Sequence, residues 1–380
     1  WLAIPGQLFL GLISLVLIPL VLVSIVQGIT GSGGGATLRK LGGRLLVFVL
    51  LTTTAASALG VGIAQVARPG DLLRDAVATV SPDAPDAAAL LPAAAATSDA
   101  VSRQLVERLP DMIVDLLPAS AKEALLERDM LAVVILAVLL GIACTVADRK
   151  RLQPLLDVLG ALLEVSMTVV KWAMFLAPLA VFGLMAQLVI QVGLGTIGSL
   201  AAYAGAVLLG LVLLYVLFLA MIGMLTDRGV LLFSRSVAPV QLMAFSTSST
   251  AAVMPLSIET AISKLGVRSD TANLVIPLAA TINMAGTALY QSIAILFLAQ
   301  AASIDLSAGA TVGIVVSVVA ASVGAPGTPG VGIVILSNIA AGAGIPATGL
   351  PLVLGLDRPL DMARTAVNVT GDLTACVVVD

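Results

Sequence analysis

The chain has 380 residues, of which 59% are apolar and 11% charged, with a net charge of −3 and no histidine. A soluble domain carries about a quarter charged residues, so this composition excludes a soluble protein and predicts an integral membrane protein. The negative charge argues against a nucleic-acid partner. The two cysteines, Cys144 and Cys376, supply neither a disulfide framework nor a metal-binding set.

Apolar runs long enough to cross a bilayer as helices follow one another along the chain. Runs of about 20 residues indicate helices, because the strands of a transmembrane barrel are shorter and alternate. The sequence therefore predicts an all-α polytopic membrane protein. The predicted spans cover residues 8–29, 43–66, 130–147, 156–192, 197–225, 272–300 and 348–379.

Residues 67–128 interrupt this apolar pattern with Ala, Asp and Pro, and their acidic residues outnumber their basic ones. Such a composition predicts an extracellular loop. We expect residues 67–100 to be flexible and residues 105–126 to form a helix along the membrane surface. No residue in the segment indicates chemistry.

Two further apolar segments are too broken to be ordinary spans. Residues 229–262 centre on the Ser/Thr run 246–250, and residues 307–345 centre on the Gly/Pro-rich stretch 322–332. Two apolar arms around a polar or glycine-rich tip are typical of a re-entrant helical hairpin. A membrane tolerates such a tip only where it lies in protein or lines a cavity.

The basic residues favour the re-entrant interpretation. They follow the first, third and fifth spans and precede the sixth. They share one face, predicted to be cytoplasmic, only if both broken segments return to the side where they begin. Two such units, each followed by a long span, indicate inverted repeats, which are typical of secondary transporters. The basic residues on this predicted cytoplasmic face are Arg39, Lys40, Arg44, Arg149, Lys150, Arg151, Arg228, Arg235, Lys264 and Arg268.

The last span carries the clearest functional signal. On a helix, Asp357, Asp361, Arg364, Asn368 and Asp372 fall within about 80° of arc. Ionisable groups at bilayer depth cost a few kcal/mol each, so we expect them to face a cavity or a partner and to serve function. The stripe predicts a binding site. The alternative is an ion-pair network that only holds helices together.

Other polar motifs are weaker. Free amides and hydroxyls at 246–250 suit a carboxylate ligand, with small-residue helix packing as the alternative. Asn283 and Gly286 interrupt the sixth span and predict an unwound turn, unless Asn283 only joins two helices. The run Thr52-Thr53-Thr54, taken alone, indicates helix packing.

Two sequence words carry a family resemblance. They are Asn-Met-x-Gly-Thr at 283–287 and Asp-x-x-x-Asp-x-x-Arg-Thr-x-x-Asn-Val-x-Gly-Asp at 357–372. With the Ser-rich and Gly-rich tips in this order, residues 1–380 resemble the dicarboxylate/amino acid:cation symporters, which include the glutamate transporters.

The resemblance implies a glutamate-transporter-like fold and a homotrimer, in which a transport domain moves against a fixed scaffold by an elevator motion. The scaffold would comprise residues 1–37, the family's second helix with the first absent, and the trimerisation helices at 129–195. The transport domain would comprise residues 38–66 and 196–380. Within it, helices at 267–300 and 348–380 would follow hairpins at 229–262 and 307–345.

The resemblance also implies roles for single residues. Arg364 would bind the side-chain carboxylate of an acidic amino acid, and Asp361 its amino group. Asn368, Thr250 and the Ser249 backbone would take the α-carboxylate. The full substrate set would be Ser249, Thr250, Thr287, Gly332, Asp361, Arg364, Thr365 and Asn368.

Two sodium sites follow from the same resemblance. The first would use the Asp372 carboxylate with carbonyls of Ala279, Asn283 and Asn368. The second would use carbonyls of Thr281, Ser322, Val323 and Ala325.

The chain departs from the family pattern at two positions. Members with a third sodium site usually carry aspartate where this chain has Ala285. The other ligands there, Thr52, Thr53 and Asn283, are neutral, so we expect this site to be weakened or absent. Neutral amino acid transporters of the family also carry alanine there. Where archaeal members have arginine this chain has Ser248, and Arg358 is expected to supply the positive charge near the first hairpin tip.

The sequence therefore predicts a secondary active transporter of aspartate or glutamate in a bacterial or archaeal inner membrane, coupled to sodium and without other cofactors. Proton coupling, and neutral amino acids or dicarboxylates as substrates, are the alternatives. A channel is disfavoured because it should lack re-entrant gates at both faces. An enzyme is disfavoured because the sequence offers no nucleophile–base pair, metal cluster or histidine.

Overall fold

The computed structural model describes residues 36–80, 130–192, 195–323, 331–345 and 350–380, with scattered positions before residue 31. These residues form helices joined by turns, and no strand occurs among them. The helices are α2 (Ala36–Ala67), α3 (Pro69–Val80), α8 (Met130–Val146), α9 (Arg149–Val192), α10 (Gly195–Leu225), α11 (Val230–Thr247), α12 (Thr250–Ser263), α13 (Ser269–Ile282), α14 (Ala285–Ala301), α15 (Ala308–Val323), α16 (Val331–Gly342) and α17 (Leu350–Val379).

Apart from the first, at 8–29, the apolar spans predicted from the sequence contain helices in the described residues. Within the described part of the chain, four stretches are long and apolar enough to cross a membrane. They are Leu41–Ala67, Gly198–Leu225, Val230–Thr247 and Ser269–Ala301. The helix α9 begins at Arg149, earlier than the predicted start at 156, and runs on for 44 residues. The predicted helix over residues 1–37 lies almost wholly outside the described residues.

The helix α3 corrects one prediction. The sequence analysis expected residues 67–100 of the extracellular loop to be flexible, and this is wrong for residues 69–80, which form a helix. The backbone N–H of Gly70 donates to Gln300 Oε1 at 3.1 Å, and a Cβ at Gly70 would lie 2.4 Å from the Phe297 carbonyl oxygen. Contact with α14 thus orders a segment whose composition alone indicates a loop. The predicted surface helix at 105–126 lies outside the described residues.

The helix α14 forms the centre of the fold and is buried along nearly its whole length. On one side it packs closely against α2, where a Cβ at Gly60 would lie 2.7 Å from the Leu289 carbonyl oxygen. The buried hydroxyls of Ser57 and Ser292 share a hydrogen bond of 2.7 Å across this contact. Small residues therefore let the two backbones approach, as is common between membrane helices.

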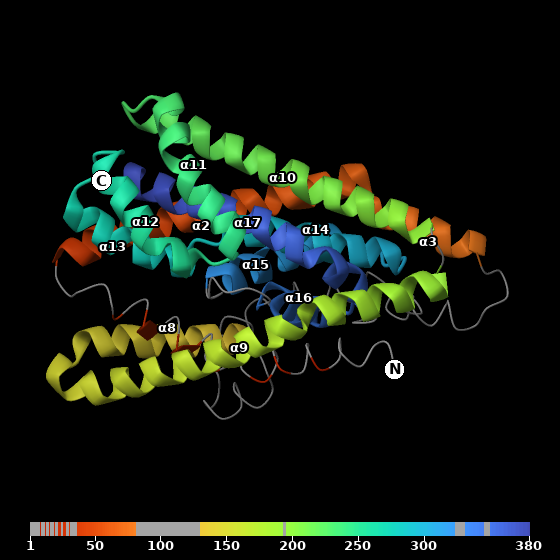
Figure 1. Ribbon diagram of the computed structural model, residues 1–380, viewed down its shortest axis with the longest axis horizontal. Coiled ribbons are helices and arrows are strands. Elements are labelled where there is room, and N and C mark those ends of the chain that lie inside the picture. The colour runs from red at the N-terminus through yellow and green to blue at the C-terminus, as the bar shows by residue number, and fades with distance from the viewer. Residues whose placement is uncertain are drawn as a thin grey trace.

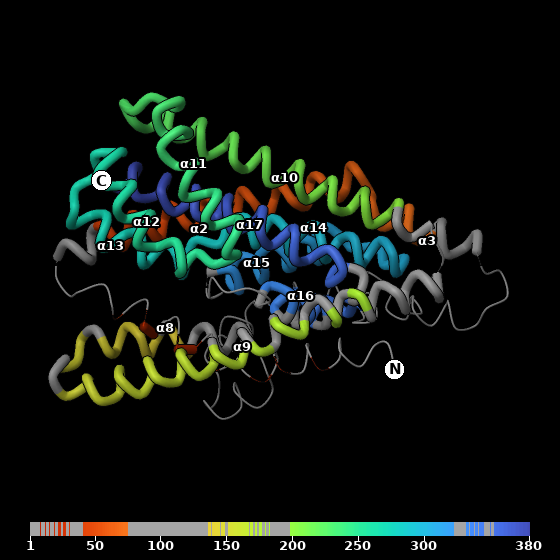
Figure 2. The backbone as a smooth tube through the Cα atoms, in the orientation of Figure 1, coloured from red at the N-terminus to blue at the C-terminus, as the bar shows by residue number. Residues whose placement is uncertain are grey.

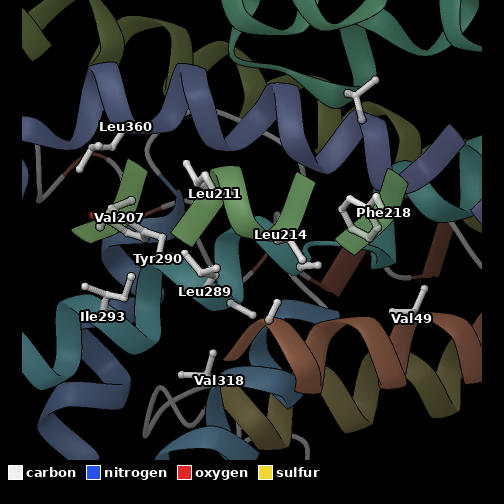
Figure 3. Close-up of a cluster of buried hydrophobic side chains, with 14 of the residues drawn as sticks. Val49, Val207, Leu211, Leu214, Phe218, Leu289, Tyr290, Ile293, Val318 and Leu360 are labelled. Carbon is white, nitrogen blue, oxygen red and sulfur yellow. The ribbon is translucent and has the colours of Figure 1, made fainter. Parts of the chain in front are cut away.

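On its other side α14 faces α10 and α17. Figure 3 shows Val207 and Leu211 of α10 between Leu360 of α17 and the α14 residues Leu289 and Ile293. This apolar layer fixes α17 beside α14, so the polar residues of the two helices can meet.

Two pairs of consecutive helices pack against the same core. The first turns between α11 and α12, where Ser248 adopts a left-handed conformation (φ 51°) and the Ser249 side chain accepts a hydrogen bond from the N–H of Ala252. Figure 2 traces this pair beside α17, which both helices contact. The second pair is α15 and α16, which also contact each other. The residues that join them, 324–330, lie outside the described part.

The predicted unwound turn is confirmed. The helix α13 ends at Ile282, and α14 begins at Ala285. Between them Asn283 (φ −99°, ψ 77°) and Met284 (φ −108°, ψ 45°) leave the helical region. The span predicted as one helix at 267–300 is therefore two helices with a break at the Asn-Met motif.

The helices α8 and α9 lie along one side of this body (Figure 1), where α9 contacts α17 and α8 contacts α15. Several large apolar side chains of α9 are exposed, among them Trp172, Phe175 and Phe182. A lipid or protein surface, rather than water, suits such a face.

Candidate functional site

The polar stripe of α17 lies inside the helical body. The exposed fractions are 7% for Asp357, 4% for Asp361, 3% for Arg364, 3% for Asn368 and 2% for Asp372. The helix packs against α10, α11, α13 and α14, so these groups are enclosed by protein. Their partners are therefore other parts of the chain or a ligand.

Arg364 is the centre of the stripe. Its Nη2 donates to Asp361 Oδ1, and its Nη1 lies 4.0 Å from Asp357 Oδ1. The guanidinium carbon stands 4.5 Å from the centre of the Tyr290 ring, and the Tyr290 hydroxyl donates to Asp357 at 3.0 Å. One cation is thus held by two carboxylates and an aromatic face, all buried.

The backbone at the start of α16 lies against the Arg364 guanidinium. A Cβ at Gly332 would lie 3.1 Å from both terminal nitrogens of Arg364, so a side chain there would displace the guanidinium. Arg364 Nη1 is buried and has no hydrogen-bond partner among the described residues. A charged donor without an acceptor is costly, and a ligand carboxylate would satisfy it.

Asn368 joins α17 to the start of α14. Its Oδ1 accepts from the N–H of Gly286 at 2.8 Å, and its Nδ2 donates to Thr287 Oγ1 at 3.2 Å. In an unbroken helix, the Gly286 N–H would donate to a backbone carbonyl. The Thr365 hydroxyl donates to the carbonyl oxygen of Asp361 at 2.7 Å, within its own helix. The structure thus brings Thr287, Arg364, Thr365 and Asn368 to one region.

Asp372 meets the unwound turn one layer further along α17. Asn283 Nδ2 donates to Asp372 Oδ1 at 3.0 Å, and the Ala279 carbonyl accepts from the Asn283 N–H at 2.7 Å. Asn283 Oδ1 is buried without a hydrogen-bond partner in the described part of the chain. No lysine or arginine pairs with Asp372 among the described residues. A buried carboxylate beside an unsatisfied amide oxygen suits a hard cation such as sodium.

The residues assigned to the second cation site are only partly described. Thr281 lies near the end of α13, and Ser322 and Val323 form the last turn of α15. Ala325 lies outside the described residues. The grouping of these carbonyls stays a prediction.

The residues assigned to the third cation site are all buried, and their grouping into one site stays a prediction. The Thr52 hydroxyl donates to the Phe48 carbonyl within α2 at 2.8 Å. Thr53 Oγ1, like Asn283 Oδ1, has no hydrogen-bond partner among the described residues, and Ala285 is 1% exposed. Neutral oxygens are therefore available here, but residue 285 contributes no charge.

In the turn between α11 and α12, the side chains of Ser249 and Thr250 have partners within the protein. Ser249 caps α12, and the buried Thr250 hydroxyl donates to the Ala280 carbonyl at 3.0 Å. Ser248 is 2% exposed, whereas Arg358 is exposed on α17. The α-carboxylate roles of Ser249 and Thr250, and the suggested role of Arg358 near Ser248, stay predictions.

Tyr290 and Gln291 received no role from the sequence, and Asp357 was named only as part of the polar stripe of α17. Tyr290 contacts the Arg364 guanidinium, Asp357 accepts from Tyr290, and the fully buried Gln291 reaches the second helix pair. A glutamine inside an apolar helix is itself a signal for a polar contact. What it contacts could not be read from the sequence.

The arrangement suits a ligand that carries both signs of charge. A ligand carboxylate can pair with Arg364. A ligand ammonium group can then replace the Arg364 guanidinium as the partner of Asp361. Without the ammonium group, Asp361 would remain buried and lose its cation.

A comparison with known protein families identifies the family of this chain. The model of the sodium:dicarboxylate symporter family matches residues 1–380. The chain belongs to this family. It is 32% identical to a proton/sodium-glutamate symport protein of Bacillus subtilis, over 98% of this chain and 84% of the relative. It is also 30% identical to a proton/glutamate-aspartate symporter of Escherichia coli, over 98% of this chain and 83% of the relative.

A further relative bears a different substrate name. The chain is 30% identical to a C4-dicarboxylate transport protein of Rhodospirillum rubrum, over 98% of this chain and 81% of the relative. Similarity alone therefore leaves more than one substrate class for this family member, and its own residues have to separate them.

Proposed function

We propose that the chain is a secondary active transporter that takes up aspartate or glutamate together with cations, sodium foremost. The observation that carries the proposal is the buried group of Arg364 with Asp361 and Asp357. Membership of a symporter family and the names of the glutamate and aspartate relatives support transport over catalysis.

The charges at the site select the substrate class. An acidic amino acid supplies a side-chain carboxylate for Arg364 and an ammonium group for Asp361. A C4-dicarboxylate would engage Arg364 but leave Asp361 buried without a cation, and a neutral amino acid would leave Arg364 unpaired. Asn368, Thr250 and the Ser249 backbone would hold the α-carboxylate, with Thr287, Thr365 and Gly332 around it.

Cation coupling rests on Asp372. The Asp372 carboxylate is buried, and only an amide donor, Asn283, is identified beside it. A bound cation would therefore compensate its buried negative charge. The carbonyls of Ala279, Asn283 and Asn368 would complete this site, and those of Thr281, Ser322, Val323 and Ala325 a second. A proton is the alternative coupling ion, because relatives are named for proton symport as well.

The family suggests the architecture of the moving parts. Residues 1–37 and 129–195 would form a trimeric scaffold in the inner membrane, and residues 38–66 and 196–380 a transport domain that moves by an elevator motion. The pairs α11–α12 and α15–α16 would be the re-entrant hairpins of two inverted repeats. The sharp turn at Ser248 and the contact between α11 and α12 support a hairpin that returns to its own side.

A binding titration tests the substrate and cation assignments together. Purified protein is titrated with aspartate, glutamate, serine and succinate, with and without sodium. We expect aspartate or glutamate to bind most tightly, and only when sodium is present. Uptake into proteoliposomes under imposed sodium or proton gradients then identifies the driving ion. Preferred binding of succinate would favour the dicarboxylate alternative, and sodium-independent uptake driven by protons would replace the cation assignment.

Ala285 offers a separate test of cation number. Ala285→Asp would add a carboxylate to the third cation site proposed from Thr52, Thr53 and Asn283. Buried oxygens of Thr53 and Asn283 lack partners in the described residues. We expect the dependence of aspartate affinity on sodium concentration to steepen by about one ion, because binding of each linked ion adds to the slope. The control is Ala285→Asn, which has a similar shape without charge and should leave the slope unchanged. An identical slope in Ala285→Asp would contradict a weakened third site.

A further inference from the structure

Gln291 joins the two helices of the second helix pair through a single side chain. Its Nε2 donates to the Gly332 carbonyl at 3.3 Å, and its Oε1 accepts from the Ser322 hydroxyl at 3.4 Å. Gln291 and Ser322 are both fully buried. Ser322 lies in the last turn of α15 and Gly332 in the first turn of α16, so the amide connects the facing ends of these helices to α14.

Each partner of this amide contacts a different part of the proposed site. The Gly332 backbone lies against the Arg364 guanidinium, with 3.1 Å between its notional Cβ and both terminal nitrogens. The Ser322 carbonyl belongs to the second cation site of the proposed function. The residue before Gln291, Tyr290, supplies the ring beneath the same guanidinium. Gln291 therefore bonds to two residues, each of which belongs to a different proposed ligand position.

An amide is the side chain that these partners require. The Gly332 carbonyl needs a donor, and the Ser322 hydroxyl needs an acceptor; glutamine provides both without charge. A carboxylate of the same length would turn lone pairs toward the Gly332 carbonyl and would be buried without a cation. An alanine would leave the carbonyl and the hydroxyl without their present partner.

We propose that Gln291 is a positioning residue that couples the second cation site to substrate binding at Arg364. A cation that fixes the end of α15 would fix Ser322, and Gln291 would carry that constraint to Gly332 and so to the surface beside the guanidinium. The coupling is reciprocal, because each ligand changes the affinity of the other by the same factor. This inference rests on the proposed function.

The loss of the link is tested with Gln291→Ala. Aspartate binding is titrated at low and at saturating sodium, in wild type and variant. We expect the ratio of the two affinities to fall by about tenfold or more, within the usual range of coupling between sites. Because a cavity could also destabilise the fold, the unfolding temperature is measured alongside.

Gln291→Glu adds a readout that a packing role would not give. The protonated carboxyl can donate to Gly332 and still accept from Ser322, whereas the ionised form cannot donate. We therefore expect the sodium dependence of aspartate binding to approach that of wild type at low pH and to be lost as pH rises. In wild type, where the amide of Gln291 does not titrate, the sodium dependence of aspartate binding should not increase in this way at low pH.

The matched control is Ser292→Ala. Ser292 is the next residue of α14 and is equally buried, but its hydroxyl bonds to Ser57 of α2 and not to Ser322 or Gly332. Its loss should change the unfolding temperature and leave the affinity ratio unchanged. A Gln291→Ala protein with the wild-type ratio overturns this inference alone. A wild-type protein that binds no acidic amino acid overturns the proposed function as well.

Discussion

Arg364→Cys should lower the affinity for aspartate by about two orders of magnitude or more and abolish its uptake. Breaking a buried charge pair costs about 3–5 kcal/mol, and each 1.4 kcal/mol is tenfold in affinity. The variant removes the only cation that the described structure places within 4.0 Å of Asp361 and Asp357. Labelled aspartate uptake into proteoliposomes, with serine uptake in parallel, measures the effect.

The same variant should change the kind of substrate accepted. Without the guanidinium, the region beside Gly332 has no group that requires a second carboxylate, so a neutral amino acid loses less than aspartate does. The ammonium group of serine can still pair with Asp361. We expect the ratio of serine to aspartate uptake to rise, even if total uptake falls.

The control for Arg364→Cys is Arg151→Ala. Arg151 pairs with Asp148 at 3.9 Å but is 89% exposed, so its pair should contribute little and its loss should leave aspartate uptake unchanged. Arg364→Lys keeps the charge but loses the planar pair of donors, and should bind aspartate more weakly than wild type. Unchanged aspartate uptake in Arg364→Cys would defeat the substrate assignment.

The sequence could predict the parts of the fold that depend on local pattern. Helical spacing alone placed Asp361, Arg364 and Asn368 on one face of α17. Because charged groups in an apolar span are costly, their position on one face predicted a binding site. Likewise Asn283 and Gly286 predicted the break in the sixth span, since both weaken a helix. These inferences need only the chain near each residue.

Features that depend on distant contacts could not be predicted in the same way. The helix α3 forms where composition indicates a loop, because Gly70 packs on α14 some 230 residues away. The partners of Gln291 lie on α15 and α16, and no local pattern names them. The sequence thus identified the polar residues of α17 better than the groups that surround them.

Asp361→Asn should shift the preference of the protein from acidic amino acids toward dicarboxylates. In wild type, a dicarboxylate at Arg364 would leave the Asp361 carboxylate buried with its cation engaged elsewhere. The amide removes that cost and also removes the partner of the substrate ammonium group. We expect aspartate affinity to fall by about two orders of magnitude and succinate affinity to rise relative to it.

Competition binding of aspartate and succinate at saturating sodium measures this preference. Asp270→Asn is the control, because Asp270 is an exposed acid in the first turn of α13 and its loss should leave the aspartate-to-succinate ratio unchanged. Asp357 stays beside Arg364 in the variant, so the guanidinium keeps one carboxylate and the site keeps its shape. If Asp361→Asn still preferred aspartate by the wild-type ratio, Asp361 would not be the ammonium-binding group. Selection between the two substrate classes would then have to come from elsewhere in the site.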